Sequence, residues 1–203
     1  MLEVFLISRG VDPGLVINIS PEDTVWHGIP GKRKISAGEL LTIDIACAVR
    51  GWWADAARTF AIGSVDARRK NLMTAAWEAT RAIVSKMSDG STGTEAFRAV
   101  EDICLKRKVS LIPEAAGHGI GRRIHEPPSL TYDGRTYEPL VSGRLYTAEP
   151  VITAGGGQIL ISSDGSAVTS DGEPSAHYEV TVLLLRHGVH ILGAPGWMEQ
   201  PPC

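Results

Sequence analysis

Two apolar segments of similar length, Leu40–Val49 and Trp52–Ile62, flank the dipeptide Arg50-Gly51. Apolar runs on either side of a short glycine turn predict an antiparallel hairpin. Side chains alternate between the two faces of a strand, so one face of the first segment is large and apolar and the other is small or polar. We expect the first face to lie in the core; its members are Leu41, Ile43, Ile45, Cys47 and Val49.

Periodicity elsewhere predicts two long helices between sets of strands. Apolar residues recur at helical spacing over Asp66–Met87, with Asp66 as the N-cap, and from Thr92 or Thr94 to about Arg107. Strands are predicted at Leu15–Ser20, Arg144–Ile152, Gly157–Ser162, His177–Leu185 and Val189–Gly193, loops at Pro21–Lys34 and Gly117–Pro128, and a helix end within residues 1–9. This order favours an α+β fold with an antiparallel or mixed sheet, in one domain over residues 1–203.

The composition narrows the compartment and the partners. The 203 residues carry a net charge of −3 and a pI near 6.1, and no basic run predicts binding to nucleic acid or to an anionic membrane. No apolar run approaches the roughly 18 residues of a membrane span, and the N-terminus lacks the basic region of a signal peptide. Cys47, Cys104 and Cys203 are too far apart for a zinc ribbon or a disulfide framework. We therefore expect a cytoplasmic protein.

Two carboxylates interrupt the apolar hairpin. With the turn at Arg50-Gly51, Asp44 lies opposite Ala57, and Asp55 is its diagonal neighbour on the same face, with Cα atoms about 7–8 Å apart. Carboxylates this close repel each other unless a cation lies between them. Either acid alone could be an exposed strand residue in a salt bridge, but two converging acids indicate a shared cation at least as strongly.

Three more residues could complete such a site. His118 lies in a loop whose glycines at 117, 119 and 121 would let the backbone approach a ligand, although a lone histidine is more often a structural residue. Glu149 and Glu179 lie in apolar strands that offer no obvious basic partner. Together with the two aspartates, they supply more carboxylate than one divalent ion needs. The set therefore predicts two metal ions with shared carboxylates, and it suits Mn²⁺, Fe²⁺, Co²⁺ or Zn²⁺.

Five motifs in order resemble one known family. They are HGIP at His27–Pro30, then TIDI…GWWADAARTF, GHGIGRRIHEPP, YTAEP and SAHYEVT. Over about Leu15–Leu192 the chain resembles the methionine aminopeptidases, metallopeptidases with the pita-bread α+β fold, which has helices on the outer face of its sheet.

The resemblance implies a role for each candidate residue. It implies that Asp44 chelates one metal, that Asp55 and Glu179 bridge both, and that His118 and Glu149 complete the second. It further implies that His125 contacts the scissile carbonyl and the tetrahedral intermediate, and that His27 lines the substrate site. His177 is not a ligand in this interpretation, and we expect it to be exposed to solvent.

The implied activity is removal of the N-terminal residue, methionine by resemblance, from peptides or nascent proteins. A metal-activated water would attack the first peptide carbonyl, and Glu149 would pass its proton to the leaving amine. The free α-amine of the substrate would bind at a metal. Two alternatives stay open: an X-Pro-type peptidase with the same fold, or a binding protein on that fold without catalysis.

The chain departs from the family pattern in three places. Only Met1–Gly10 stands where the family has a first pair of helices, so one sheet face would be partly bare. A truncated homologue, a misassigned start or a homodimer that covers the gap would each explain this. The methionine pocket is altered at Ile124 and Ser166, and Trp26 could refill it; Ala116 replaces a common cysteine. These changes leave the preference for methionine open.

Overall fold

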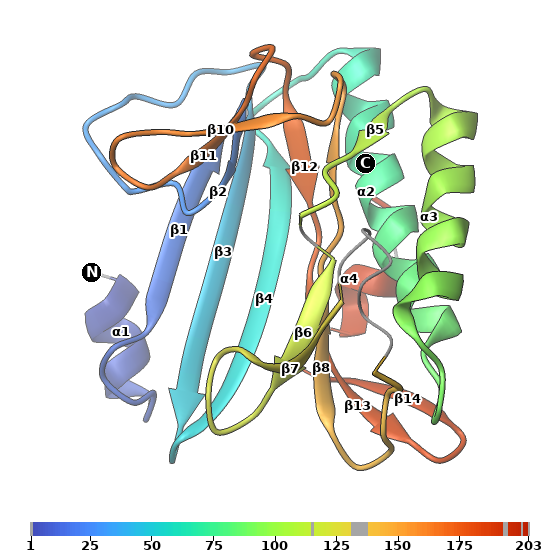
Figure 1. Cartoon of the computed structure of the whole chain (residues 1–203). Helices are drawn as coiled ribbons and strands as arrows, with labels where there is room; N and C mark the ends of the chain where they lie inside the picture. Colours follow the sequence, from blue (N-terminus) through green and yellow to red (C-terminus); the bar gives the residue numbers. More distant parts are fainter. Residues whose placement is uncertain (1, 115, 131–137, 193–194, 200, 203) are drawn as a thin grey trace.

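The computed structural model describes residues 2–114, 116–130, 138–192, 195–199 and 201–202 of the 203-residue chain (Figure 1). The first sheet has the order β1-β3-β4, with β1 at Val16–Pro21, β3 at Leu40–Val49 and β4 at Trp52–Ala61. Strands β3 and β4 form the predicted hairpin, with Asp44 opposite Ala57 as expected. Its turn residues, Arg50 and Gly51, both have positive φ, as a two-residue turn between twisted strands requires.

The second sheet has the order β14-β13-β8-β6-β7, and all of its pairings are antiparallel. Its strands are β6 (Gly117–Ile120), β7 (Glu126–Leu130), β8 (Leu145–Ala148), β13 (Val180–Leu185) and β14 (Gly188–Leu192). Two smaller sheets have the orders β10-β11-β2 and β12-β9-β5. Their strands are β2 (Thr24–Trp26), β5 (Ser110–Leu111), β9 (Val151–Thr153), β10 (Ile159–Ile161), β11 (Ala167–Thr169) and β12 (Ser175–His177).

Two loop predictions and two strand predictions needed correction. The predicted loops Pro21–Lys34 and Gly117–Pro128 contain β2 and β6 and most of β7. The predicted strand Arg144–Ile152 is interrupted after Ala148, because Pro150 has no N–H to donate to a ladder. The predicted strand His177–Leu185 is also two elements, β12 and β13. Between them the chain passes from one sheet to the next, and the backbone N–H of Glu179 donates to Ala57 of β4 at 2.8 Å.

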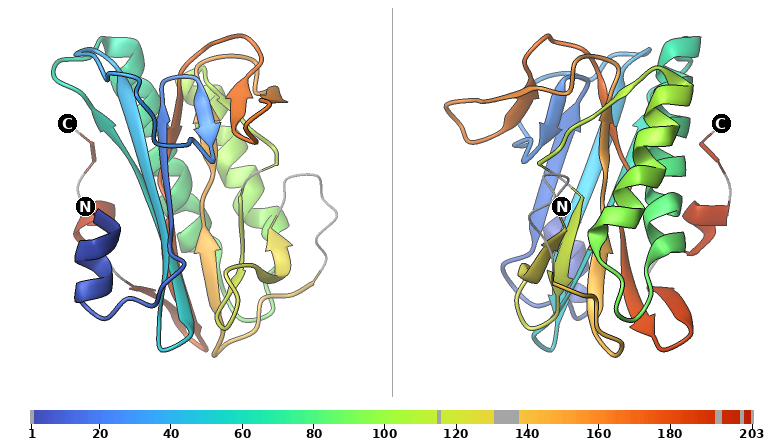
Figure 2. Two further views of the ribbon diagram at one scale, coloured as in Figure 1. Left: turned by 90° about the vertical axis from the view of Figure 1, so that its left-hand side faces the viewer. Right: turned by 45° about the vertical axis from the view of Figure 1, so that its right-hand side comes forward.

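The second half of the molecule contains the sheets β14-β13-β8-β6-β7 and β12-β9-β5. Helices α2 (Ala67–Lys86) and α3 (Gly93–Arg107) pack side by side behind it (Figures 1 and 2). Asp66 caps α2 as predicted, because its carboxylate accepts a hydrogen bond from the Arg69 N–H at 2.8 Å. The predicted apolar face of α2 is buried and packs against Tyr146, Tyr178 and Val182 in the main core. The remaining helices, α1 (Leu2–Ser8) and α4 (Pro195–Glu199), are short.

The hairpin has its large apolar face on the outside, contrary to our expectation. On the face that we expected in the core, Ile43 and Ile45 are only half-buried, and Val49 is 48% exposed. On the opposite face, Thr42, Ala46 and Ala48 are buried, because β12 and the cavity described below lie on that side. Helix α1 lies on the outer side (Figure 2), but none of its residues is buried.

Candidate metal centre

The hairpin brings Asp44 and Asp55 to the same inner face. Asp55 lies opposite Ala46 on β4 and is 8% exposed, while Asp44 is half-buried on β3. Asn18 of β1 donates a hydrogen bond from Nδ2 to Oδ2 of Asp44 at 2.9 Å, which orients that carboxylate. The backbone N–H of Asp55 donates to Oγ1 of Thr181 at 2.9 Å, so β4 and β13 are joined beside the acid.

His118 and Glu149 face this pair from the second sheet. Nε2 of His118 lies 3.1 Å from Oε1 of Glu149, which also accepts a hydrogen bond from the Thr147 hydroxyl at 2.8 Å. The same hydroxyl accepts the backbone N–H of His118 at 2.9 Å. Thr147 therefore fixes both residues, one on β6 and one just after β8.

The glycines on either side of His118 allow close packing of the neighbouring backbone. A side chain at Gly117 would overlap the carbonyl oxygen of Thr147, and one at Gly119 would come within 2.5 Å of the carbonyl oxygen of Pro127. Both glycines therefore let the neighbouring backbone pack closely against β6.

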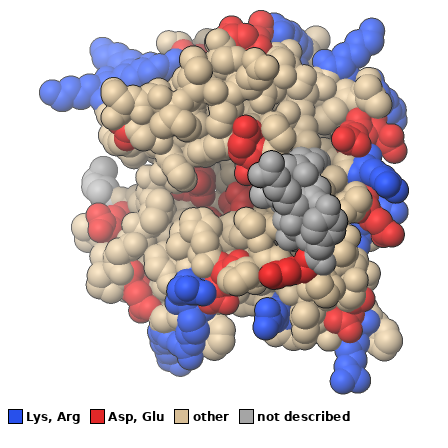
Figure 3. Space-filling model, in the orientation of Figure 1, with Lys and Arg blue, Asp and Glu red and all other residues tan. Residues whose placement is uncertain are grey.

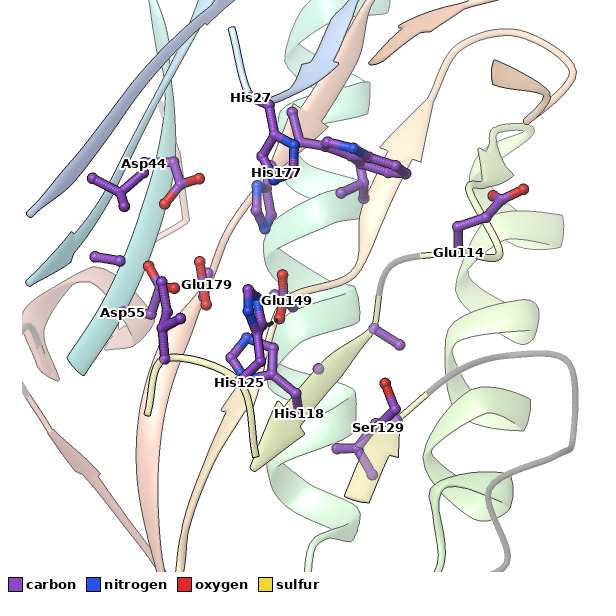
Figure 4. A pocket seen from close by; sticks show the side chains of 18 of the residues that line it. His27, Asp44, Asp55, Glu114, His118, His125, Ser129, Glu149, His177 and Glu179 are labelled. Atoms are coloured by element: carbon purple, nitrogen blue, oxygen red, sulfur yellow. Dashed lines mark ion pairs between the residues drawn. The ribbon is translucent and has the colours of Figure 1, made fainter. Parts of the chain in front are cut away.

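Glu179 completes the convergence from the segment between β12 and β13. It is 2% exposed, and its backbone is held by the hydrogen bond to Ala57. Polar atoms of Asp55, His118 and Glu179 all lie within 4.8 Å of one another, as do those of Glu149, His177 and Glu179. The structure thus brings together the side chains of all five predicted ligands around one hollow (Figure 4).

The electrostatics of this cluster are unfavourable without a cation. Burial, and then the charge of Asp44, raise the pKa of Asp55 to about 8. Burial, followed by the charges of Glu149 and Asp55, also raises the pKa of Glu179 well above its ordinary value. Each residue has a buried carboxylate oxygen without a hydrogen-bond partner among the described residues, Oδ1 of Asp55 and Oε1 of Glu179. Buried carboxylates normally have such partners, so the residues fit divalent cations.

In the His118–Glu149 pair, the interaction between the partners outweighs the effect of burial on each pKa. Burial by itself would lower the pKa of His118, but the hydrogen bond and charge of Glu149 outweigh it and raise that pKa. Burial by itself would raise the pKa of Glu149, but the hydrogen bond and charge of His118 lower it. Each partner therefore stabilises the charged form of the other while no metal is bound.

A cavity of about 870 Å³ opens over the cluster. Figure 3 shows it as a hollow with acidic side chains at its base. His27, just after β2, and His125, between β6 and β7, both line it. The His125 ring stands 4.5 Å from that of His118, centre to centre, in an edge-on arrangement. Burial, and then the charge of His118, lower the pKa of His125, so its imidazole is neutral near pH 7.

His177 contradicts our expectation of solvent exposure. It is 4% exposed and lines the floor of the cavity beside Glu149 and Glu179 (Figure 4). Burial lowers its pKa against the opposing charges of Glu149 and Asp44, so it is neutral. Its position two residues before Glu179 gave no signal, because β12 ends at His177 and alternation cannot be continued past that point.

Comparison with known proteins agrees with this geometry. The profile of metallopeptidase family M24 matches residues 4–186. The methionine aminopeptidase of Clostridium perfringens is 32% identical over 201 residues, which is 94% of this chain and 81% of that protein. The chain belongs to metallopeptidase family M24. This membership confirms the predicted pita-bread fold and the predicted class, a metalloaminopeptidase of the methionine aminopeptidase type.

Solved structures of M24 enzymes superpose on nearly the whole chain. The methionine aminopeptidase of Rickettsia prowazekii has a TM-score of 0.87 at 28% identity and covers 93% of this chain and 81% of its own. An Xaa-Pro dipeptidase from Bacillus anthracis has a TM-score of 0.79 at 23% identity, with 52% of its chain covered, which shows a shared fold alone. Among the described residues of this M24 chain, no helix is long and apolar enough to cross a bilayer.

The M24 cavity also shows where the altered pocket residues lie. Trp26 and Ile124 line it, but Ser166 is not among its lining residues. Ser166 instead donates its hydroxyl to Asp164 at 2.7 Å. Trp26 pairs with Ala167, the residue after Ser166. Ala116 lines the cavity, and its carbonyl accepts the backbone N–H of Glu149 at 3.0 Å.

Proposed function

We propose that this chain is a two-metal aminopeptidase that removes the N-terminal residue from peptides or nascent proteins. The observation that carries the proposal is the pair of buried carboxylate oxygens, one on Asp55 and one on Glu179, that lack partners beneath an open cavity. Asp44 and Asp55 would hold one ion, His118 and Glu149 the other, and Asp55 and Glu179 would lie between them. Four carboxylates and one imidazole carry enough charge and enough donor atoms for two divalent ions.

The residues around the ions would then have separate roles in catalysis and substrate binding. When bound, divalent ions supply Lewis-acid activation of water and of the substrate carbonyl. Glu149 would accept the proton of the attacking water and return it to the leaving amine. The neutral imidazole of His125 would donate a hydrogen bond to the oxygen on which negative charge develops. His27, exposed at the cavity wall with φ of +54°, would contact the peptide.

We propose methionine as the preferred N-terminal residue. Trp26, Ile124 and Val151 provide an apolar wall next to the acidic cluster. The thioether of methionine adapts to irregular apolar pockets and makes favourable contacts with aromatic rings. Trp26 therefore supplies an aromatic surface in this pocket. Cys47 and Cys104 are unpaired thiols, in keeping with the cytoplasmic location predicted from the sequence.

Peptide hydrolysis tests the function directly. The purified protein, loaded with Mn²⁺ or Co²⁺, is offered Met-Ala-Ser, Ala-Ala-Ser and an X-Pro peptide, and the released residue is identified. We expect release of methionine above all, and loss of that release in Asp55→Ala. Release only from the X-Pro peptide would favour the X-Pro-type alternative. No release from any peptide, with metal shown to be bound, would favour the binding protein.

We also propose that a second copy of the chain covers the outer face of the first sheet. That face joins half-buried Ile43 and Ile45 to exposed Trp52 and Phe60, which are 52% and 38% exposed. Arg58, opposite Ile43, interrupts this surface and places its guanidinium over the Phe60 ring. Exposed apolar surface beside such a charge is typical of interaction sites. We expect dimers at micromolar concentration in sedimentation, and monomers for Trp52→Ser combined with Phe60→Ser. A monomeric wild-type protein would disprove self-association.

A further inference from the structure

His177 is a polar side chain in the cavity for which the proposed function provides no role. The residue is 4% exposed, and within the described part of the chain neither Nδ1 nor Nε2 of its ring has a hydrogen-bond partner. Buried imidazoles nearly always bond to a protein group, a water or an ion. An imidazole whose two nitrogens lack hydrogen-bond partners, in the floor of an acidic cavity, therefore indicates that a ligand binds to it.

The backbone of His177 is held firmly, so the ring position is not accidental. Its N–H donates to Oγ1 of Thr59 at 2.8 Å, and the same hydroxyl donates to its carbonyl at 3.0 Å. The residue also pairs with Val151 across β12 and β9. These contacts point the ring toward Glu149 and Glu179, as Figure 4 shows.

The distances around the ring suit an ion between the side chains. A nitrogen of His177 and carboxylate oxygens of Glu149 and Glu179 all lie within 4.8 Å of one another, yet no hydrogen bond joins the ring to either acid. Metal–ligand bonds to nitrogen and oxygen are about 2.0–2.2 Å. Two donor atoms on opposite sides of one ion are thus roughly 4 Å apart, which is within the 4.8 Å that encloses these three atoms.

We propose that His177 is a sixth metal ligand, so that two imidazoles, His118 and His177, hold the metal pair together with the four carboxylates. The inference rests on the proposed function, because it adds a donor to the same site. Imidazole suits Zn²⁺, whereas carboxylate suits Mn²⁺. The second imidazole therefore shifts the preference of this site toward Zn²⁺ over Mn²⁺.

X-ray absorption on the Co²⁺-loaded wild-type protein counts the imidazoles directly. We expect two imidazole contributions per metal pair, and one in His177→Gln. His190→Gln, on the exposed part of β14, is the matched control and should leave both contributions. A single contribution in the wild-type protein would overturn the proposal, and that measurement does not depend on whether the variant folds.

Metal competition gives a second readout that is independent of activity. The ratio of Zn²⁺ to Mn²⁺ affinity should fall by about 10-fold or more in His177→Gln, as expected for loss of a metal-site donor. His177→Asn serves as the second variant if the first does not fold. An unchanged ratio in a folded variant would contradict the proposal. If the wild-type protein binds two ions through one imidazole, only this inference fails; if it binds none, the proposed function fails as well.

Discussion

The two halves of the molecule meet at the candidate metal centre but differ in what covers their outer faces. The first half is the sheet β1-β3-β4, and the second half contains the sheets β14-β13-β8-β6-β7 and β12-β9-β5. The second half is backed by α2 and α3, and the residues that pack there, such as Leu72, Ile83 and Val182, are at most 1% exposed. The first half carries Ile43 and Ile45 on its outer face, both only half-buried. Each half nevertheless supplies acids to the same cavity, from β3 and β4 on one side and from the segments just after β8 and just before β13 on the other.

This difference separates two requirements that are often combined. The first requirement is that each candidate ligand points into the cavity, which depends on strand register and on the inner face of the sheet. Both halves meet this requirement. The stability of the sheet depends on what covers the outer face, and among the described residues a pair of long packed helices covers only the second half. The first half should therefore be the less stable part and the more sensitive to a partner.

The largest expected effect comes from a ligand on the backed half. Glu149→Gln keeps the size of the side chain but removes the proposed proton acceptor, so we expect kcat to fall by about 10²–10⁴-fold. The measurement is steady-state release of methionine from a tripeptide, with bound metal determined in parallel. Glu114→Gln, another acid that lines the cavity, is the matched control and should retain activity. Equal losses in both variants would contradict the role of Glu149.

Core truncations test the difference between the halves more directly. Leu72→Ala removes a side chain that is 0% exposed in the packed half, and we expect it to lower the free energy of unfolding by about 2–5 kcal/mol. Ile45→Ala removes a half-buried side chain from the open face, so its cost should be smaller.

Urea denaturation at several protein concentrations would measure both variants. If a second copy covers Ile45, the cost of Ile45→Ala should grow with concentration, whereas that of Leu72→Ala should not. An Ile45→Ala cost as large as that of Leu72→Ala in the monomer would show that the open face is covered from within the chain.

The pH dependence of the metal-free protein tests the acid on the open half. The pKa of Asp55 is about 8 in the folded chain because of burial and then the charge of Asp44, and about 4 in the unfolded chain. Between these values the folded state binds more protons, so this contribution to stability is complete below about pH 4 and is lost as the pH rises through about 8. One such group changes the free energy of unfolding by at most about 1.4 kcal/mol per pH unit.

Urea titrations in a chelator, at about pH 5.5 and about pH 7.5, would show that loss of stability. Asp55→Asn should reduce the slope, because the amide does not titrate. Saturating metal should reverse the trend, since the ions require ionised carboxylates. Parallel slopes for the wild-type protein and Asp55→Asn would show that Asp55 is ionised when the site is empty.

The sequence predicted what depends on local order. The β3–β4 register follows from the turn at Arg50-Gly51 and gave Asp44 opposite Ala57. The helical periodicity gave α2 with its cap at Asp66. The four acids and the histidine-bearing loop were recognised from ordered motifs, and the structure places them around one cavity.

What the sequence could not give depends on how the sheets stack. Alternation divides the side chains of β3 into two faces, but it does not say which face receives another layer, so Ile43 and Ile45 were assigned to the wrong side. The strand break after Ala148 and the change of sheet before Glu179 were missed because Glu149 and Glu179 each lie in a run of apolar residues. Such a run resembles one continuous strand. His177 was missed because its burial arises from contacts with Thr59 and Val151, which are distant in the sequence.

The smallest expected effect concerns how α2 and α3 are held together behind the second half. The Arg107 guanidinium forms a 2.5 Å ion pair with Glu78, and it lowers the pKa of that carboxyl through a hydrogen bond that outweighs burial. Both side chains are about a quarter to a third exposed, so solvent and salt screen the pair, and Glu78→Gln should cost only about 0.2–1 kcal/mol.

The cost of Glu78→Gln also has a predictable pH dependence. Because the folded pKa of Glu78 is depressed, its contribution is present above the ordinary value of about 4.3 and is lost as the pH falls through the folded value. Thermal melts of Glu78→Gln and the wild-type protein at low and high salt would measure it. If the cost approached that of Leu72→Ala and did not change with salt, charge rather than apolar packing would hold the helices. The two halves would then differ in their ion pairs and not in what covers them.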